Sequence, residues 1–132
     1  MLYLTVMDDK ISLQTGAIPT TEELEVANFL ASKNKNIRFL APSTEKGMKT
    51  PDIEMDGMQW EIKTPIGKSA NTIKRAFKTA LRQSKDIIFD LRHSKLPDEP
   101  NIDKLKKEFN DIKSAQRLLI ITKKHELIDL RK

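Results

Sequence analysis

The sequence predicts a single α/β domain in which a mixed sheet is flanked by helices. Segments with apolar residues at helical spacing alternate along the chain with short apolar segments typical of strands. The 132 residues fall within the usual size of one domain, 38% of them are hydrophobic, and no repeat or Gly/Ser-rich linker divides them. We therefore expect the element order αβββαβαββ, preceded by a short N-terminal segment.

The chain divides into a short N-terminal segment and the domain that follows it. Residues 1–18 show a weak alternation of apolar residues at positions 2–6 and further apolar residues at 11, 13 and 18, which fits either an edge strand or a leader segment. Residues 19–132 form the domain proper. Thr20 and Glu23 have the spacing of a capping box, and apolar residues then recur at helical spacing to about Lys33. The first helix is therefore expected to begin at Thr20.

A strand, a loop and a hairpin follow the first helix. Residues 37–41 form a short apolar strand, and the polar residues 42–50 are typical of a loop. Two further strands, at 52–55 and 58–64, are joined by Asp56-Gly57, a dipeptide suited to the positive φ angles of a tight turn. This hairpin is the best-marked feature of the chain.

A second helix, capped by Ser69 or Asn71, is expected to run to about Gln83, because apolar residues recur there at helical spacing. Those residues are Ile73, Ala76, Phe77, Ala80 and Leu81. Residues 87–91 then form an apolar run of the kind buried on both faces of a sheet. Asp90 in this run either pairs with a basic neighbour or marks the end of the strand.

The C-terminal part adds a helix and two strands. Pro97 and Pro100 are expected in the loop that leaves the strand at 87–91. A third amphipathic helix is expected over 102–112, followed by strands at 118–121 and 126–130 around a polar turn.

The composition excludes several kinds of site. The chain has no cysteine, so it has no disulfide, thiolate zinc site, iron–sulfur cluster or cysteine nucleophile. A formal net charge of +5 favours a polyanionic partner such as nucleic acid. No apolar run approaches the ~20 residues that span a bilayer, and Asp8 and Asp9 lie where a signal peptide would be apolar. We expect a soluble chain without a membrane-spanning segment.

The hairpin carries the sharpest chemical pattern, formed by Asp52, Glu61 and Lys63. Side chains alternate along a strand, so Glu61 and Lys63 share a face, and pairing across the turn can bring Asp52 near them. Two close carboxylates repel each other unless a divalent cation such as Mg²⁺ bridges them. A neighbouring lysine can orient a water or offset charge on a phosphate, so the pattern predicts metal-assisted phosphodiester hydrolysis. The alternative is that Asp52 flanks a loop while Glu61 and Lys63 form an exposed strand edge.

Basic residues are concentrated next to this hairpin. Residues 62–85 contain seven Lys and Arg and no acid, so the remainder of the chain has a net charge of −2. On the second helix the basic residues fall on one stripe, opposite the apolar one, and with Lys68 they are expected to bind phosphates. The stripe comprises Lys74, Arg75, Lys78 and Arg82. The alternative is an ordinary solvated helix face.

Glutamates near the start of the first helix provide a possible third acid. Glu23 lies on the inward-facing stripe and can reach the same site, or it serves only in the cap with Thr20. His93 and His125 are isolated in the sequence and are expected to be ordinary surface residues.

The motif formed by Pro51-Asp52 and Glu61-Ile62-Lys63 resembles that of the PD-(D/E)xK nuclease superfamily. The superfamily has a restriction-endonuclease-like αβββαβ core, which matches the predicted order from the first helix to the strand at 87–91. Over residues 20–132 the chain also resembles the C-terminal tRNA-cleaving domain of contact-dependent growth inhibition (CdiA) toxins. The stretches that carry this resemblance are 49–53, 60–65, 83–84, 87–92 and 118–123.

The resemblance implies an Mg²⁺-dependent ribonuclease whose substrate is tRNA. It implies delivery as part of a larger secreted toxin, action in the cytoplasm of a bacterial cell, and neutralisation by a cognate immunity protein. Asp52, Glu61 and Lys63 take the catalytic positions of the family, and Glu23 takes that of the helix acid, where Glu22 or Glu25 also fits.

In the mechanism we expect, Mg²⁺ or another divalent cation is held by Asp52, Glu61 and the carbonyl of Ile62. Lys63 positions a water for in-line attack. Three alternatives remain open: a DNA nuclease of the same fold, a non-catalytic nucleic-acid-binding module, and a structural domain whose basic helix meets an acidic protein.

Overall fold

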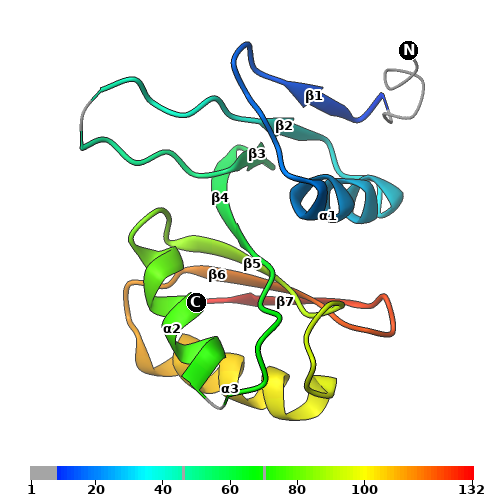
Figure 1. The fold of residues 1–132 in the computed structure, drawn as a ribbon, viewed down its shortest axis with the longest axis vertical. Helices are drawn as coiled ribbons and strands as arrows, with labels where there is room; N and C mark the ends of the chain where they lie inside the picture. Colours follow the sequence, from blue (N-terminus) through cyan, green and yellow to red (C-terminus); the bar gives the residue numbers. More distant parts are fainter. Residues whose placement is uncertain (1–8, 46, 70) are drawn as a thin grey trace. The chain divides into compact units, whose positions relative to one another are not determined.

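The computed structural model describes residues 9–45, 47–69 and 71–132 (Figure 1). The chain forms two compact units, Met1–Gln59 (unit 1) and Trp60–Lys132 (unit 2). The boundary between them falls inside strand β4 (Met58–Lys63). The described residues contain three helices and seven strands, with both parallel and antiparallel pairing, which confirms the predicted α/β class with mixed sheet pairing.

Unit 1 contains a short mixed sheet and one helix. Strand β1 (Ile11–Leu13) pairs in parallel with β2 (Ile37–Phe39), which pairs antiparallel with β3 (Ile53–Met55). Helix α1 (Thr21–Ser32) packs beside β1 and β2 (Figure 1). The weak alternation noted near the N-terminus lies at residues 2–6, outside the described residues, and the described strand there is β1.

Helix α1 begins as its sequence predicts. The Thr20 side-chain oxygen accepts a hydrogen bond from the Glu23 N–H at 3.1 Å, and the Glu23 carboxylate accepts one from the Thr20 N–H at 3.0 Å. This reciprocal pair is the predicted capping box, and it satisfies two N–H groups that a helix start would otherwise leave unbonded. Val26, Ala27 and Leu30 are fully buried on the inner side of the helix.

The turn between β3 and β4 also has the predicted geometry. Asp56 has a φ of 55° and Gly57 a φ of 76°, the left-handed values that a tight hairpin turn requires at both central positions. The Asp56 carboxylate lies 3.0 Å from the Lys35 ammonium, an exposed ion pair within unit 1. The residues that reverse the chain before β4 are therefore those expected from the sequence.

Unit 2 contains a four-stranded sheet. Strands β4, β5 (Asp86–Asp90) and β6 (Arg117–Ile121) run parallel, and β7 (Leu127–Arg131) is antiparallel to β6. Helices α2 (Asn71–Leu81) and α3 (Asp98–Asp111) lie together along one face of this sheet (Figure 1). All five residues of β5 are buried, as expected for its continuous apolar run.

The core of unit 2 forms between this sheet face and the two helices. Ile87 and Phe89 of β5 contribute to it, and the Phe89 ring stacks on that of Phe77 from α2 with 6.0 Å between centroids. Leu105 and Phe109 of α3 complete the helical side. Ile87 and Phe89 point to the same face of β5, and their side chains pack against both helices.

The predicted start of α3 was wrong. The sequence places Pro97 and Pro100 in a loop, whereas α3 begins at Asp98 and includes Pro100 in its first turn. Proline is tolerated there because N–H groups of the first turn have no partner within the helix. The Asp98 carboxylate accepts hydrogen bonds from the Lys123 N–H at 3.0 and 3.1 Å, which ties the helix start to the turn after β6.

None of the helices in the described part of the chain combines the length and apolar character needed to cross a membrane.

Candidate functional site

The predicted common face of Glu61 and Lys63 is confirmed in unit 2. The Lys63 ammonium lies 3.7 Å from a Glu61 carboxylate oxygen. These residues are in register with Ile87 and Phe89 of β5, so they lie on the sheet face that carries the helix core. Glu61 is only 7% exposed, so the alternative of a fully exposed, alternating strand edge does not describe it.

Ile62, whose carbonyl is a predicted metal ligand, lies between Glu61 and Lys63 in β4. Its side chain is 6% exposed and is in register with Ile88. Successive side chains of a strand point to opposite faces, so Ile62 packs on the face opposite to Glu61 and Lys63. Burial of Ile62 thereby helps to fix the direction in which its two charged neighbours point.

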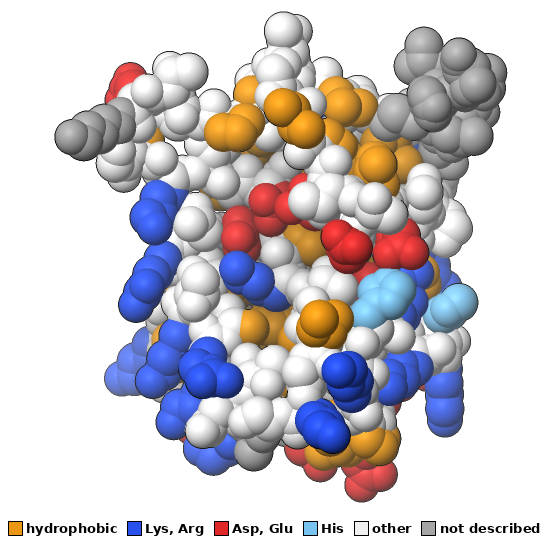
Figure 2. All heavy atoms as spheres, viewed as in Figure 1, with side chains coloured by type: hydrophobic (Ala, Val, Ile, Leu, Met, Phe, Trp, Pro, Cys, Tyr) orange, Lys and Arg blue, Asp and Glu red, His pale blue; other side chains and the backbone are white. Residues whose placement is uncertain are grey.

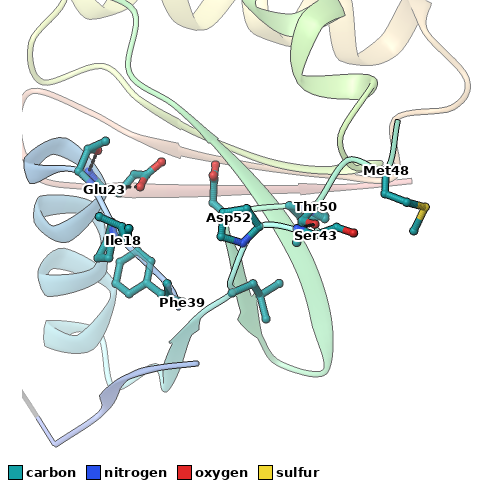
Figure 3. Close-up of a pocket in the computed structure, with 13 residues that line it drawn as sticks. Ile18, Glu23, Phe39, Ser43, Met48, Thr50 and Asp52 are labelled. Atoms are coloured by element: carbon teal, nitrogen blue, oxygen red, sulfur yellow. Dashed lines mark hydrogen bonds between the residues drawn. The ribbon is translucent and has the colours of Figure 1, made fainter. Parts of the chain in front are cut away.

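In unit 1 the structure brings together Glu23 and Asp52. The Glu23 side chain is directed towards Asp52 (Figure 3). The pKa of Glu23 is raised, first by burial and then by the neighbouring Asp52 carboxyl group, through its negative charge and through side-chain hydrogen bonding. Hydrogen bonds with Thr20 act in the opposite direction. Glu23 therefore serves both as the N3 residue of the cap and as a neighbour of the motif acid.

The two acids line a pocket of about 250 Å³ that is formed entirely by unit 1. The pocket lies among the start of α1, the end of β2 and the segment that leads into β3. Of Glu22, Glu23 and Glu25, all of which are described, Glu23 is the one that lines it. The geometry thus favours Glu23 among the three glutamates that the sequence left as candidates.

The chemistry of the acids fits a hard cation. Mg²⁺ prefers carboxylate oxygens, and a cation beside Glu23 and Asp52 would favour the ionised form of both. Among the described residues, neither unit gathers three or more Asp, Glu or His side chains into a metal-binding group. Of the acids predicted to act at the site, the structure groups Glu23 with Asp52 in unit 1, and Glu61 lies in unit 2.

Helix α2 has the two faces that its sequence predicts. Ile73, Phe77 and Ala80 are buried, and the basic residues of the opposite stripe are exposed. The exposed residues are Lys68 in the preceding loop and Lys74, Arg75, Lys78 and Arg82. Figure 2 shows Lys and Arg side chains gathered on the side of unit 2 where Figure 1 draws α2. This surface is available to a phosphate backbone.

The charge of Asp90, in a buried strand, is compensated by the neighbouring Arg92. It is fully buried at the end of β5, and Arg92 donates two side-chain hydrogen bonds to its carboxylate, at 2.8 and 2.9 Å. Both explanations offered by the sequence, pairing and strand end, are confirmed. His93 and His125 are exposed, as expected.

Several residues of the unit 1 pocket were not predicted from the sequence. Ile18, Ser43, Met48 and Thr50 all line it. Met48 is an apolar residue in an otherwise polar segment, which is a signal that sequence alone offers. The sequence does not show that Ile18 and Met48 lie at one pocket, because this depends on how the segment before α1 and the segment after β2 fold together.

A known protein family matches this chain. The model of the family described as the contact-dependent growth inhibition CdiA C-terminal domain matches residues 49–127, more than half of the chain. This chain belongs to that family. The matched segment includes Asp52, Glu61, Lys63 and all of α2, whereas Glu23 precedes it. The resemblance to CdiA toxin domains is therefore confirmed at the level of the family.

A solved structure shows a similar fold. The chain aligns with a protein of the CdiA-CT/CdiI toxin and immunity complex from Burkholderia pseudomallei, with a TM-score of 0.66 and 18% sequence identity. The alignment covers 92% of this chain and 99% of the other. At this identity the similarity concerns the fold. No curated protein matches the chain.

Proposed function

We propose that this chain is the toxin domain of a contact-dependent growth inhibition protein and acts as a metal-dependent nuclease of the PD-(D/E)xK type. RNA, and tRNA in particular, is the substrate we propose. The observation that carries the proposal is the Glu61–Lys63 pair. An acid and a lysine are held 3.7 Å apart on one face of β4, inside the segment that matches the family.

Each motif residue has a proposed role. Asp52, Glu61 and the carbonyl of Ile62 are the proposed ligands of Mg²⁺. When bound, the cation would supply Lewis acidity, lowering the pKa of a water and stabilising negative charge on phosphate oxygens. Lys63, held by its contact with Glu61, orients the attacking water or a phosphate oxygen. Glu23 holds a proton or a negative charge beside Asp52, according to pH.

The basic surface of α2 is the proposed contact for the phosphates that flank the scissile bond. Its exposed cations attract a polyanion without regard to sequence, because they contact the backbone and not the bases. The surface comprises Lys68, Lys74, Arg75, Lys78 and Arg82. Two or more phosphates along one strand can be held by cations spaced along a helix.

A cognate immunity protein is a further proposed partner. The similar fold from Burkholderia pseudomallei belongs to a toxin and immunity complex, which supports the same arrangement here. As a member of the CdiA C-terminal family, the domain is proposed to reach a target bacterium as part of a larger toxin and to act in its cytoplasm.

The test is a cleavage assay with purified protein. Total tRNA and plasmid DNA are incubated with wild type, Glu61→Gln or Lys63→Met in Mg²⁺ or in EDTA. We expect wild type to cleave RNA in Mg²⁺ only, and both variants to be inactive while their thermal melting stays cooperative. Cleavage that is equally fast in EDTA would overturn the mechanism, because every assigned role depends on the cation.

A second candidate function is nucleic-acid binding without turnover, which the exposed basic stripe of α2 favours by itself. It predicts salt-sensitive affinity for both nucleic acids and intact substrate in Mg²⁺. A DNA nuclease is distinguished in the same assay by cleavage of plasmid in preference to tRNA.

A further inference from the structure

The unit 1 pocket combines two carboxylates with an apolar rim. Among the described residues four large hydrophobic side chains are exposed, and two of them line this pocket: Ile18, 87% exposed, and Met48, 57% exposed. Apolar side chains of this size gain free energy when a ligand removes them from water. Their concentration at one pocket indicates a contact surface.

Apolar side chains lie on both sides of the acid. Figure 3 shows Ile18 and Phe39 on one side of Asp52, and Thr50 and Met48 on the other. Phe39 is 2% exposed, so it is anchored in the core of unit 1. The part of the pocket wall that Phe39 forms therefore has a fixed position. A flat ligand entering the pocket would therefore meet apolar surface as well as a carboxylate.

Two hydroxyl groups supply hydrogen-bond donors. The Thr50 side-chain oxygen accepts a hydrogen bond from the Ser43 N–H at 2.9 Å, and the Ser43 side-chain oxygen accepts one from the Glu45 N–H at 3.1 Å. Each oxygen is thus held in place while its own O–H proton can be donated to another group. The pocket offers donors from these hydroxyls and acceptors from the carboxylates.

Without a bound cation, the charge of the pocket favours an uncharged occupant. A phosphate placed here in EDTA would add negative charge beside the side chains of Glu23 and Asp52, both of which line the pocket. The volume, about 250 Å³, lies below the ~300–1,000 Å³ typical of sites for drug-sized ligands. A single small ring system with apolar faces and polar edges matches both properties.

We propose that this pocket binds one unstacked nucleobase of the RNA substrate, with Ile18 and Met48 against the base and the hydroxyls of Ser43 and Thr50 at its polar edge. The proposal rests on the proposed function, because it takes Asp52 as part of the nuclease motif. A base must leave its stack to enter, so the pocket favours single-stranded or loop RNA over a continuous duplex.

The test measures binding separately from cleavage. Fluorescence anisotropy in EDTA gives the affinity of a short single-stranded RNA of mixed sequence and of an abasic ribose-phosphate chain of equal length. The rim variant is Ile18→Ala with Met48→Ala. The matched control is Leu13→Ala with Ile66→Ala, whose side chains are 43% and 60% exposed and do not line the pocket.

We expect the rim variant to bind the RNA about 5- to 10-fold more weakly, because truncating both side chains removes apolar surface that would be buried against the base. Its affinity for the abasic chain and the dependence of log K on log salt should match wild type, because no phosphate contact is lost. The control variant should bind both probes as wild type does.

The outcomes separate this inference from the nuclease assignment. If wild type cleaves RNA in Mg²⁺ and the rim variant binds RNA like wild type, the base pocket is wrong and the proposed function stands. If binding depends on the bases and on the rim but wild type cleaves nothing, the base pocket stands and the nuclease assignment fails. Equal weakening for RNA and abasic chain, or no binding by wild type, overturns the base pocket and assigns the rim to backbone contacts or to a protein partner.

Discussion

Units 1 and 2 use their ionisable side chains in opposite ways. Residues 1–59 contain 6 Lys and Arg against 9 Asp and Glu, a formal charge of −3, whereas residues 60–132 contain 18 against 10, a formal charge of +8. In unit 2 two buried acids each have a cation beside them: Glu61 has Lys63, and Asp90 has Arg92. In unit 1 the structure instead places Glu23 against a second acid, Asp52.

This difference helps to separate structural charges from functional ones. A buried acid beside a cation is compensated within the fold, so its presence in a core needs no further explanation. Two carboxylates brought together raise the pKa of one of them, which is an arrangement typical of sites that bind cations or transfer protons. By this criterion Asp90 is structural, the Glu23–Asp52 pair is a candidate site, and Glu61 belongs to both groups.

The largest effect is expected from the motif acids of the two units. Asp52→Asn and Glu61→Gln should each lower the rate of RNA cleavage by about 1,000-fold, the loss that follows removal of a group stabilising charge in a transition state. Single-turnover kinetics in Mg²⁺ measure this effect. The control is Glu126→Gln, an exposed acid of unit 2, which should cleave like wild type. A Glu61→Gln variant of full activity would place Glu61 with the structural acids.

The next effect concerns stability, at the buried pair of unit 2. Arg92→Ala should lower the free energy of unfolding by about 3 kcal/mol, because it leaves the Asp90 carboxylate buried without the arginine that compensates it. Urea denaturation measures the change. Arg131→Ala is a matched control, since Arg131 contacts Asp129 across the same two-residue spacing at the surface. Its loss should cost less than about 1 kcal/mol, and equal losses would contradict the structural role assigned to burial.

A smaller effect is expected from the basic face of α2. Replacing Lys74, Lys78 and Arg82 together by Gln should weaken RNA binding about 10- to 100-fold and reduce the slope of log K against log salt by about 2 for a single strand. Anisotropy titrations at several salt concentrations give both numbers. The control variant replaces three exposed lysines of unit 2 outside α2. These are Lys106, Lys113 and Lys124. Equal losses of RNA affinity in the two variants would show that binding depends on net charge and not on the position of the basic stripe.

The smallest effect is expected from pH and the acid pair of unit 1. The folded-state pKa of Glu23 is raised from 4.5 by burial and by Asp52, so its contribution to stability is full below pH 4.5 and is lost as pH rises through the folded pKa. The Glu23→Gln variant has no ionisable group at this position, so it does not undergo this loss of stability. The difference in unfolding free energy between wild type and variant should therefore move in favour of the variant as pH rises. A difference that is constant with pH would contradict the coupling between Glu23 and Asp52.

Much of the fold was predictable because short-range signals decide it. The capping box that starts α1, the left-handed turn at Asp56-Gly57 and the two faces of α2 depend on residues within a few positions of each other. Where two local signals conflicted, the prediction was wrong. Pro100 suggested a loop, although a proline in the first turn of a helix is compatible with α3.

The candidate site was predictable in part. Alternation along one strand was enough to place Glu61 and Lys63 on a common face, because that periodicity is a property of the extended backbone. Glu23 was one of three glutamates that helical spacing left as candidates. The choice among them came from the pocket, which depends on segments that are distant in the sequence.

By itself, the sequence determined which segments become helices and strands and which side chains share a face. These properties follow from backbone geometry and from the spacing of apolar residues, and both act over a few residues. Only the tertiary structure decided that Glu23 meets Asp52, 29 positions away, and that Ile18 and Met48 line one pocket with them. Burial of apolar surface drives such long-range contacts and is not directional, so spacing along the chain does not reveal them.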